Sequence, residues 1–560
     1  MIALLQPFCA IRLPLQPILN KINQKVMKKI VLSLIVFTMT TVSAMAGGIL
    51  TNTNQSVLFL KNPARDAAIG LDGVYSNPAG VAFMPEGFHV AFNWQYAHQT
   101  RTITSTNPVF ALGKKNDGQS VKEFEGVADA PIIPSLQAAW NKGNWSIQFN
   151  FSVPGGGGSC EFADGLGSFE SVVGTIAKKL EPLGALGYDM DGYMKGRQYY
   201  YGIQLGAAYK VNPNLSVYGG LRLLYGDATY KAKISNILVK TAGGYVEFGD
   251  FMQGAIGTVE DGIAQVNNYI ADVNDGIAQV NAGIEQVNAG IAQYEAAGAP
   301  VPADLTAQQQ ALLTQQGTLT AQQQALVAKQ AQLEGTRKEL GTLQKYAEGV
   351  NLLSNQDGMG IAPVIGIDYK VKNFNFAAKY EFKTQIRMKN ESTVNKASEI
   401  AAVNKFRDAE KVNEDAPALL TIGAQWKPID EVSLNLGWHH YFDKDANWYN
   451  NTQDLLRRNT NEYLAGVEWD ITDKLNVSGG AQLTRYGLTD EFMNDMSFVV
   501  NSYSLGFGFS YKVKDNITLS AAYFQTNYDK YTRENYPTAG VSDTFTRTNR
   551  VLGLGCQLDF

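Results

Sequence analysis

A stretch near the end of the chain reads YSLGFGFSY between Tyr503 and Tyr511. Every second residue is large and apolar or aromatic, and only glycine and serine stand between them. A period of two is typical of a β-strand, because successive side chains point to opposite faces of a sheet. A soluble sheet would carry charged residues on its outward face. The small polar face and the aromatic face instead predict a strand between a narrow polar lumen and lipid.

The same alternation recurs from about Phe88 to the last residue. One face of the final stretch carries Leu552, Leu554, Cys556, Leu558 and Phe560. A terminal aromatic residue on an alternating last strand resembles the signal by which the barrel-assembly machinery recognises outer-membrane barrels. The alternative is a sheet strand that ends in phenylalanine by chance. The repeated pattern favours a barrel that spans the bacterial outer membrane, surrounded by its lipid.

Two kinds of connection separate the predicted strands. Six are short polar turns, at residues 141–144, 211–214, 372–373, 427–430, 472–473 and 514–516. Seven are long, at about residues 106–132, 154–196, 236–360, 389–416, 444–460, 488–501 and 528–546. Their alternation implies fourteen strands, an even number as bacterial barrels require. We therefore predict an all-β membrane protein, a 14-stranded antiparallel outer-membrane β-barrel over residues 88–560.

The N-terminal segment predicts export. The pair Lys28–Lys29 precedes an apolar run from Ile30 to Thr41, and Ala44–Ala46 has the small-x-small pattern of a cleavage site. Met27 is the natural start expected from this arrangement, so residues 1–46 combine an upstream extension with a signal peptide. A single membrane anchor is the alternative, but the run is short and ends in small and polar residues.

Composition excludes several other classes of protein. The formal net charge is −5 and becomes −10 without residues 1–46, which argues against nucleic acid as a partner. Cys9, Cys160 and Cys556 lack metal-ligand spacing, so no metal or cofactor is predicted. The sequence contains no Gly-x-Ser-x-Gly elbow and no phosphate-binding loop, so no enzymatic activity is predicted. We expect a monomer.

Residues 47–87 do not alternate, and they contain the motif Asn77, Pro78, Ala79 and Gly80. With the export signal, the strand number and Phe560, this segment resembles the N-terminal hatch of the FadL/TodX-type outer-membrane transporters of long-chain fatty acids and aromatic hydrocarbons. In that family an Asn-Pro-Ala motif lies in the hatch that plugs the barrel. The resemblance implies a hatch over residues 47–87. It also implies passive uptake of hydrophobic compounds, long-chain fatty acids first, by extracellular capture and lateral exit.

Strand parity predicts which cations face the lumen. A ligand carboxylate in a low-dielectric lumen needs a cation beside it. The candidates are Arg101, Arg222, Lys379, Lys383 and Arg387. The alternative is an internal salt-bridge network with Glu381 and Glu468 that fills the lumen and holds the hatch.

The third predicted strand, Trp145 to Val153, runs into Pro154, Gly155 and Gly156. Proline removes a donor from the strand ladder, and a run of glycines resists regular pairing. In the resembling family an inward kink of the third strand opens the wall. These residues are therefore a possible wall break, although their position at the outer end of the predicted strand also fits a loop.

Residues 258–347 depart from the family pattern. Isoleucine recurs every seven residues from Ile263 to Ile291, a valine or tyrosine follows each by three, and leucine recurs every seven from Leu305 to Leu340. This pattern predicts an antiparallel coiled-coil hairpin inserted in the third extracellular loop. It is either an elongated loop without chemistry or a spike that contacts a partner. Two alternative functions follow: a general or small-solute porin with an open lumen, and a barrel-anchored surface adhesin that uses the hairpin.

Overall fold

The computed structural model describes residues 52–394 and 405–560, so the predicted signal peptide lies outside the described residues. The chain forms two compact units. One comprises the hatch and the barrel, and the other comprises residues 183–186 and 237–348.

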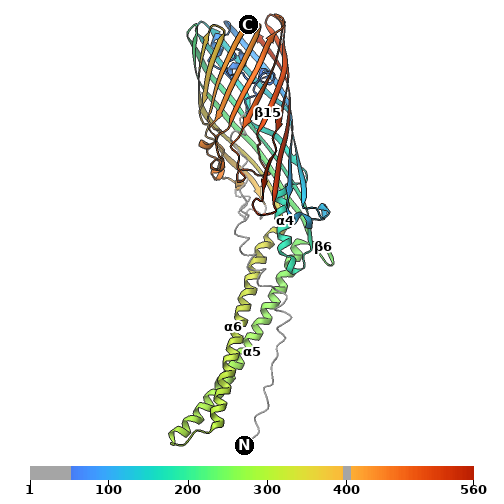
Figure 1. The fold of residues 1–560 in the computed structure, drawn as a ribbon, viewed down its shortest axis with the longest axis vertical. Coiled ribbons are helices and arrows are strands. Elements are labelled where there is room, and N and C mark those ends of the chain that lie inside the picture. Colours follow the sequence, from blue (N-terminus) through green and yellow to red (C-terminus); the bar gives the residue numbers. More distant parts are fainter. Residues whose placement is uncertain (1–51, 395–404) are drawn as a thin grey trace. The chain divides into compact units, whose positions relative to one another are not determined.

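The first unit is a closed antiparallel barrel of fourteen strands, as predicted (Figure 1). In chain order the strands are β1 (Gly87–Thr106), β2 (Val121–Lys142), β3 (Trp145–Phe162), β4 (Gly187–Asn212), β5 (Leu215–Thr241), β7 (Val350–Val371), β8 (Phe374–Glu381) continued by β9 (Arg387–Val394), β10 (Lys411–Asn413) continued by β11 (Leu419–Ile429), β12 (Val432–Tyr441), β13 (Asn461–Asp470), β14 (Leu475–Arg485), β15 (Ser502–Lys514), β16 (Ile517–Tyr528) and β18 (Ser542–Asp559). The short strands β6 (Gly244–Glu247) and β17 (Tyr531–Glu534) pair with β5 and β18. The barrel closes because Phe92 of β1 pairs with Leu136 of β2 and with Cys556 of β18.

All six predicted short turns join paired neighbouring strands. Several strands reach further into the predicted long loops than expected. The prediction that the third strand ends at Val153 is wrong, because β3 continues to Phe162 and holds the Pro-Gly run inside a strand. The seventh strand is interrupted between Glu381 and Arg387.

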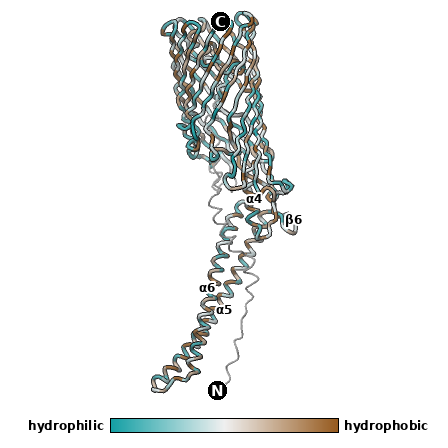
Figure 2. The backbone as a smooth tube through the Cα atoms, in the orientation of Figure 1, coloured by the Kyte–Doolittle hydropathy of each residue, from teal (hydrophilic) through white to brown (hydrophobic). Residues whose placement is uncertain are grey.

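The outward face of the barrel is apolar. Along β15, Leu505 and Phe507 are 51% and 61% exposed, whereas Ser504 and Ser510 are buried. Hydrophilic and hydrophobic residues alternate along the strands in the same way throughout the barrel (Figure 2). Aromatic pairs such as Trp145 with Tyr209, whose ring centroids are 4.8 Å apart, lie at the end with the short turns. This is the surface expected of a barrel that faces lipid.

Residues 52–86 form the hatch and contain only short helical pieces: α3 (Val57–Lys61), η1 (Leu71–Val74) and η2 (Gly80–Phe83). The Ser56 hydroxyl accepts a hydrogen bond from the Phe59 amide at 3.2 Å and caps α3. Glycines of the barrel wall allow the hatch to approach closely. A Cβ atom at Gly506 would collide with the Leu60 carbonyl, and one at Gly466 would collide with the Asn62 side chain.

The long loops carry the remaining helices of the first unit: η3 (Pro108–Leu112), η4 (Lys114–Asn116), α4 (Gly167–Lys179), η5 (Glu181–Leu183), η9 (Asp443–Asp445) and η10 (Tyr449–Leu455). Their apolar side chains and those of the adjoining strand ends form one buried cluster that includes Phe110, Phe124, Trp448, Phe498 and Phe545. The loops are therefore packed against one another rather than extended into solvent.

The second unit is mainly a helical hairpin of α5 (Phe248–Ala296) and α6 (Ala303–Gln344), followed by η6 (Lys345–Glu348). The two helices are held in register by a repeated hydrogen bond, in which a glutamine of α6 donates to an asparagine of α5. The four pairs are Gln309–Asn288, Gln316–Asn281, Gln323–Asn274 and Gln330–Asn267. None of the described helices is long and apolar enough to cross a membrane.

Candidate functional site

The motif at Asn77 lies inside the barrel and is bonded to its wall. The Asn77 Nδ2 donates to the Asp368 carboxylate of β7 at 2.6 Å, and its Oδ1 accepts from the Gly80 amide at 3.2 Å. The same carboxylate oxygen accepts from Asn375 of β8 at 2.8 Å. Asn77 therefore closes the hatch turn and fixes it to the wall at the same time.

The next two residues of the motif contact two further strands through their backbone. The Pro78 carbonyl accepts from Gln148 of β3 at 2.8 Å, and the Ala79 carbonyl accepts from Ser216 of β5 at 2.6 Å. With the bond to β7, three successive residues of the hatch bring together three strands that are not all neighbours. A short motif thus holds the hatch against one side of the barrel.

Charged residues fix the hatch to the other side of the barrel. Arg65 of the hatch forms an ion pair with Glu468 of β13. Asp66 contacts the Nε2 of His439 on β12 at 2.9 Å, and the Nδ1 of that ring contacts Glu462 of β13 at 2.9 Å. These side chains are almost fully buried, and each has its hydrogen bonds satisfied by a neighbour, as buried charges require.

Two of the predicted cations meet at the ring of Tyr75 in the hatch. Arg222 lies 4.6 Å from its centroid and Lys379 lies 4.7 Å from it. Arg222 also pairs with Glu381 and donates its Nε to Gln204 at 3.0 Å, while Lys379 donates to the Tyr75 carbonyl at 2.9 Å. Both cations therefore have partners already, and they hold the hatch.

The other two predicted cations of the seventh strand do not join this group. Lys383 donates to the Asp445 carbonyl at 2.8 Å in a long loop. Arg387 is exposed on the outer face, so its predicted position in the lumen is wrong. The reason is the interruption at residues 382–386, which shifts the alternation of side chains between β8 and β9.

The wall is interrupted between β2 and β3. These strands pair on both sides of the interruption, but residues 130–135 of β2 and 152–158 of β3 do not pair with each other. Pro131 and Pro134 lie in the first segment and Pro154 lies in the second. Because proline has no amide hydrogen, both edges lack donors where the ladder would continue.

The beginning of the hatch occupies this interruption. The Gln55 side chain donates to the Val153 carbonyl at 3.2 Å and accepts from the Val153 amide at 3.0 Å, while its backbone carbonyl accepts from the Ser135 hydroxyl of β2. Nearby, the Asn52 amide donates to the Pro154 carbonyl at 2.7 Å. The hatch thus supplies hydrogen bonds that the two strands do not make to each other.

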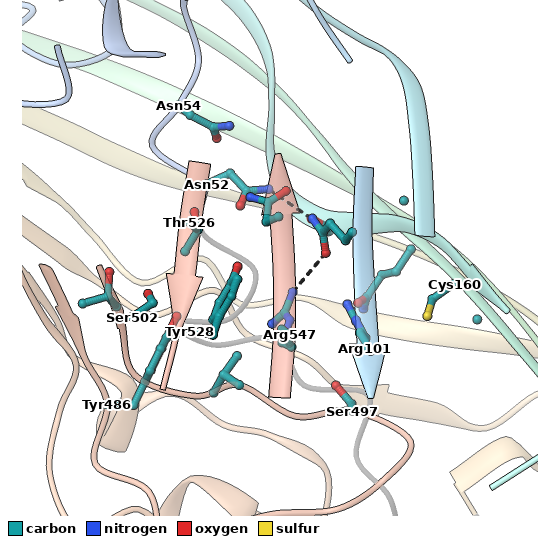
Figure 3. Close-up of a pocket in the computed structure, with 18 of the residues that line it drawn as sticks. Asn52, Asn54, Arg101, Cys160, Tyr486, Ser497, Ser502, Thr526, Tyr528 and Arg547 are labelled. Atoms are coloured by element: carbon teal, nitrogen blue, oxygen red, sulfur yellow. Dashed lines mark hydrogen bonds between the residues drawn. The ribbon is translucent and has the colours of Figure 1, made fainter. Parts of the chain in front are cut away.

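A cavity of about 190 Å³ adjoins the interruption, because Gly156 and Gly158 of β3 line it. It has a charged part, where Arg101 of β1 projects into it (Figure 3). It also has an apolar part, lined by Phe59, Phe162, Met194, Tyr230, Phe406 and Phe524. The remaining lining is polar and makes up the larger share of the surface, with side chains such as Gln198, Gln482 and Asn549. An apolar part beside charged and polar groups suits an amphipathic small molecule.

Sequence reasoning missed two residues of this region. Arg547 of β18 lies beside Arg101 in the cavity (Figure 3), and the alternation that puts Leu552 and Phe560 outside places it inside. Parity could therefore have identified it. No signal of this kind exists for Gln55, because the hatch has no periodicity.

Among residues 52–394 and 405–560, no group of histidine, cysteine, aspartate and glutamate is arranged to hold a metal ion. The geometry defines a closed β-barrel with an apolar outer surface, a luminal hatch, an amphipathic cavity and an interrupted wall.

Solved structures resemble this chain in fold. The fold is similar to that of a FadL homologue from Pseudomonas aeruginosa, with 11% sequence identity over 92% of this chain and 100% of that one and a TM-score of 0.54. The predicted FadL/TodX-type fold is therefore confirmed. The Ralstonia pickettii toluene transporter TbuX matches at 13% identity over 92% of this chain and 99% of that one, with a TM-score of 0.47. No family model and no curated protein matches the sequence.

Proposed function

We propose that this protein carries hydrophobic compounds inward across the outer membrane without an energy source of its own, and that long-chain fatty acids are its cargo. The observation that carries the proposal is the cavity, which joins a group of apolar side chains to the guanidinium groups of Arg101 and Arg547 and adjoins the interrupted wall. An apolar tail fits the first part, and a carboxylate is stabilised by the second.

The exit for such a cargo is the interruption between β2 and β3. A solute that left into the periplasm would have to displace the hatch, whose motif is bonded to three strands. A solute that left sideways would need to displace only the contacts of Gln55 and Asn52. Lateral movement also keeps an apolar tail out of water, which favours this route.

A general porin is the less favoured function, because the hatch places buried, paired side chains across the lumen. Uptake of a labelled long-chain fatty acid by cells with and without the protein tests the proposal, with a small hydrophilic sugar as control. The proposal predicts fatty-acid uptake without sugar entry. Sugar entry at a comparable rate would contradict it.

A further inference from the structure

Two arginines face each other inside the cavity. Arg101 of β1 and Arg547 of β18 are directly opposite in the register of these strands, and both line the cavity (Figure 3). Arg547 donates to the Gln99 side chain at 3.0 Å and to the Phe498 carbonyl at 3.3 Å. The Nε atoms of both arginines are buried and have no hydrogen-bond partner. No carboxylate of the described residues forms an ion pair with either arginine.

The cavity itself offers no free counter-charge. Among its described lining residues the only acidic side chain is Glu462. That carboxylate already contacts His439 at 2.9 Å, Tyr441 at 2.9 Å, Thr484 at 3.0 Å and Gln482 at 2.6 Å. Four neighbours satisfy its oxygens, so Glu462 does not compensate the two arginines.

This arrangement is unfavourable without a ligand. Like charges directly opposite on neighbouring strands repel each other, and the buried Nε donors of these two half-buried side chains need an acceptor. One carboxylate would neutralise only one of the two guanidinium groups. A dianion with three terminal oxygens would neutralise both and could accept from the Nε and Nη atoms of each.

We infer that the cavity binds amphiphiles whose head group carries two negative charges, of the phosphate-monoester class, more tightly than fatty acids of the same chain length. The inference rests on the proposed function, because it assumes that the cavity holds the cargo. It makes the facing pair Arg101 and Arg547 the residues that select the head group, while the apolar walls accept the tail.

Binding of four single-chain compounds to the full-length mature barrel in a neutral detergent tests this inference: dodecyl phosphate, dodecyl sulfate, dodecanoate and dodecanol. The measurement is made at about pH 8, where a phosphate monoester is a dianion because its second pKa is about 6. We expect dodecyl phosphate to bind at least about tenfold more tightly than dodecanoate. Dodecyl sulfate, with three terminal oxygens and one charge, should stay close to dodecanoate.

Variants of the two arginines test whether these residues cause the preference for phosphate over carboxylate. Either Arg547→Gln or Arg101→Gln should reduce the preference for phosphate to less than about threefold and leave one cation for a carboxylate. The matched control Lys512→Gln, an exposed lysine of β15, should leave all four affinities unchanged.

Three results would overturn the inference and leave the proposed function standing. They are equal or tighter binding of dodecanoate, equal binding of sulfate and phosphate, and binding of two dodecanoate molecules per barrel. If none of the four compounds binds, the proposed function itself fails.

Discussion

The side chain of Gln55 forms two hydrogen bonds with the backbone of Val153, donating to its carbonyl at 3.2 Å and accepting from its amide at 3.0 Å. This is the pair of bonds that a neighbouring strand would form with Val153. One residue of the hatch therefore replaces the missing partner of β3. A movement of the hatch that withdrew Gln55 would therefore leave this edge of β3 without a partner.

Removal of this side chain should loosen the wall. Gln55→Ala leaves the Val153 amide and carbonyl without partners, at a cost of about 1–3 kcal/mol for the buried groups. We expect a lower midpoint of thermal unfolding and a higher leak of small solutes in a liposome-swelling assay. Gln119→Ala, at an exposed loop position, serves as the control. An unchanged leak in Gln55→Ala would mean that the hatch does not seal the interruption.

The contact between Asn77 and Asp368 can be tested by exchange of the two side-chain types. The Asn77 amide nitrogen lies 2.6 Å from the Asp368 carboxylate, and Asn77→Asp puts a second carboxylate in its place. This variant should destabilise the barrel by about 1–3 kcal/mol. Asn77→Asp combined with Asp368→Asn restores one amide and one carboxylate. Recovery of most of the lost unfolding free energy in the double variant is the expected result, and no recovery would assign the effect to another contact.

Arg222 and Arg101 should respond differently to loss of charge. Arg222→Gln leaves the buried Glu381 without its cation, a change that costs about 3–5 kcal/mol in buried pairs. Arg101→Gln removes a cation that has no paired carboxylate among the described residues, so stability should hold or rise. Binding of dodecyl phosphate should weaken in Arg101→Gln, whereas Arg547 still provides one cation for a fatty-acid carboxylate. Similar losses of stability in both variants would contradict this division of roles.

Lys61 gives the hatch a pH dependence. Burial lowers the pKa of Lys61 to about 8 from its ordinary value of 10.5. The unfolded chain therefore binds more protons than the folded one between these values, and the free energy of unfolding should rise with pH there. The contribution is up to about 3 kcal/mol, measured as the difference between wild type and Lys61→Met. An identical pH profile in the two proteins would show that Lys61 does not contribute.

The fourteen strands and their six short turns could be predicted because alternation and turn residues are local properties of the sequence. The Pro-Gly run after Val153 could not be assigned to a strand, because it pairs with β4 in an irregular register and the hatch bonds its other edge. Neither contact is visible in the local sequence. Arg387 was misplaced because parity does not survive the interruption at residues 382–386. Gln55 carries no sequence signal, since only the folded hatch brings it to the wall.

The helical hairpin offers a separate test of register. Its glutamine–asparagine pairs repeat every seven residues in both arms, so deletion of residues 277–283 together with 314–320 preserves the remaining pairs. Deletion of residues 277–280 alone should put the arms out of register, because it is not a whole heptad, and should lower the temperature at which the helical circular-dichroism signal is lost. Equal melting of the two variants would show that these bonds do not set the register.

Cross-linking of a photoreactive fatty acid to the outer face of the barrel tests lateral exit most directly. Ile132, which lies in the unpaired part of β2, is 67% exposed, and Leu436 on β12 is 62% exposed and provides the control. Lateral exit predicts labelling near Ile132 that excess unlabelled ligand suppresses, while labelling near Leu436 does not respond. Equal and unsuppressed labelling at both positions, or suppressible labelling only in the hatch, would contradict exit between β2 and β3.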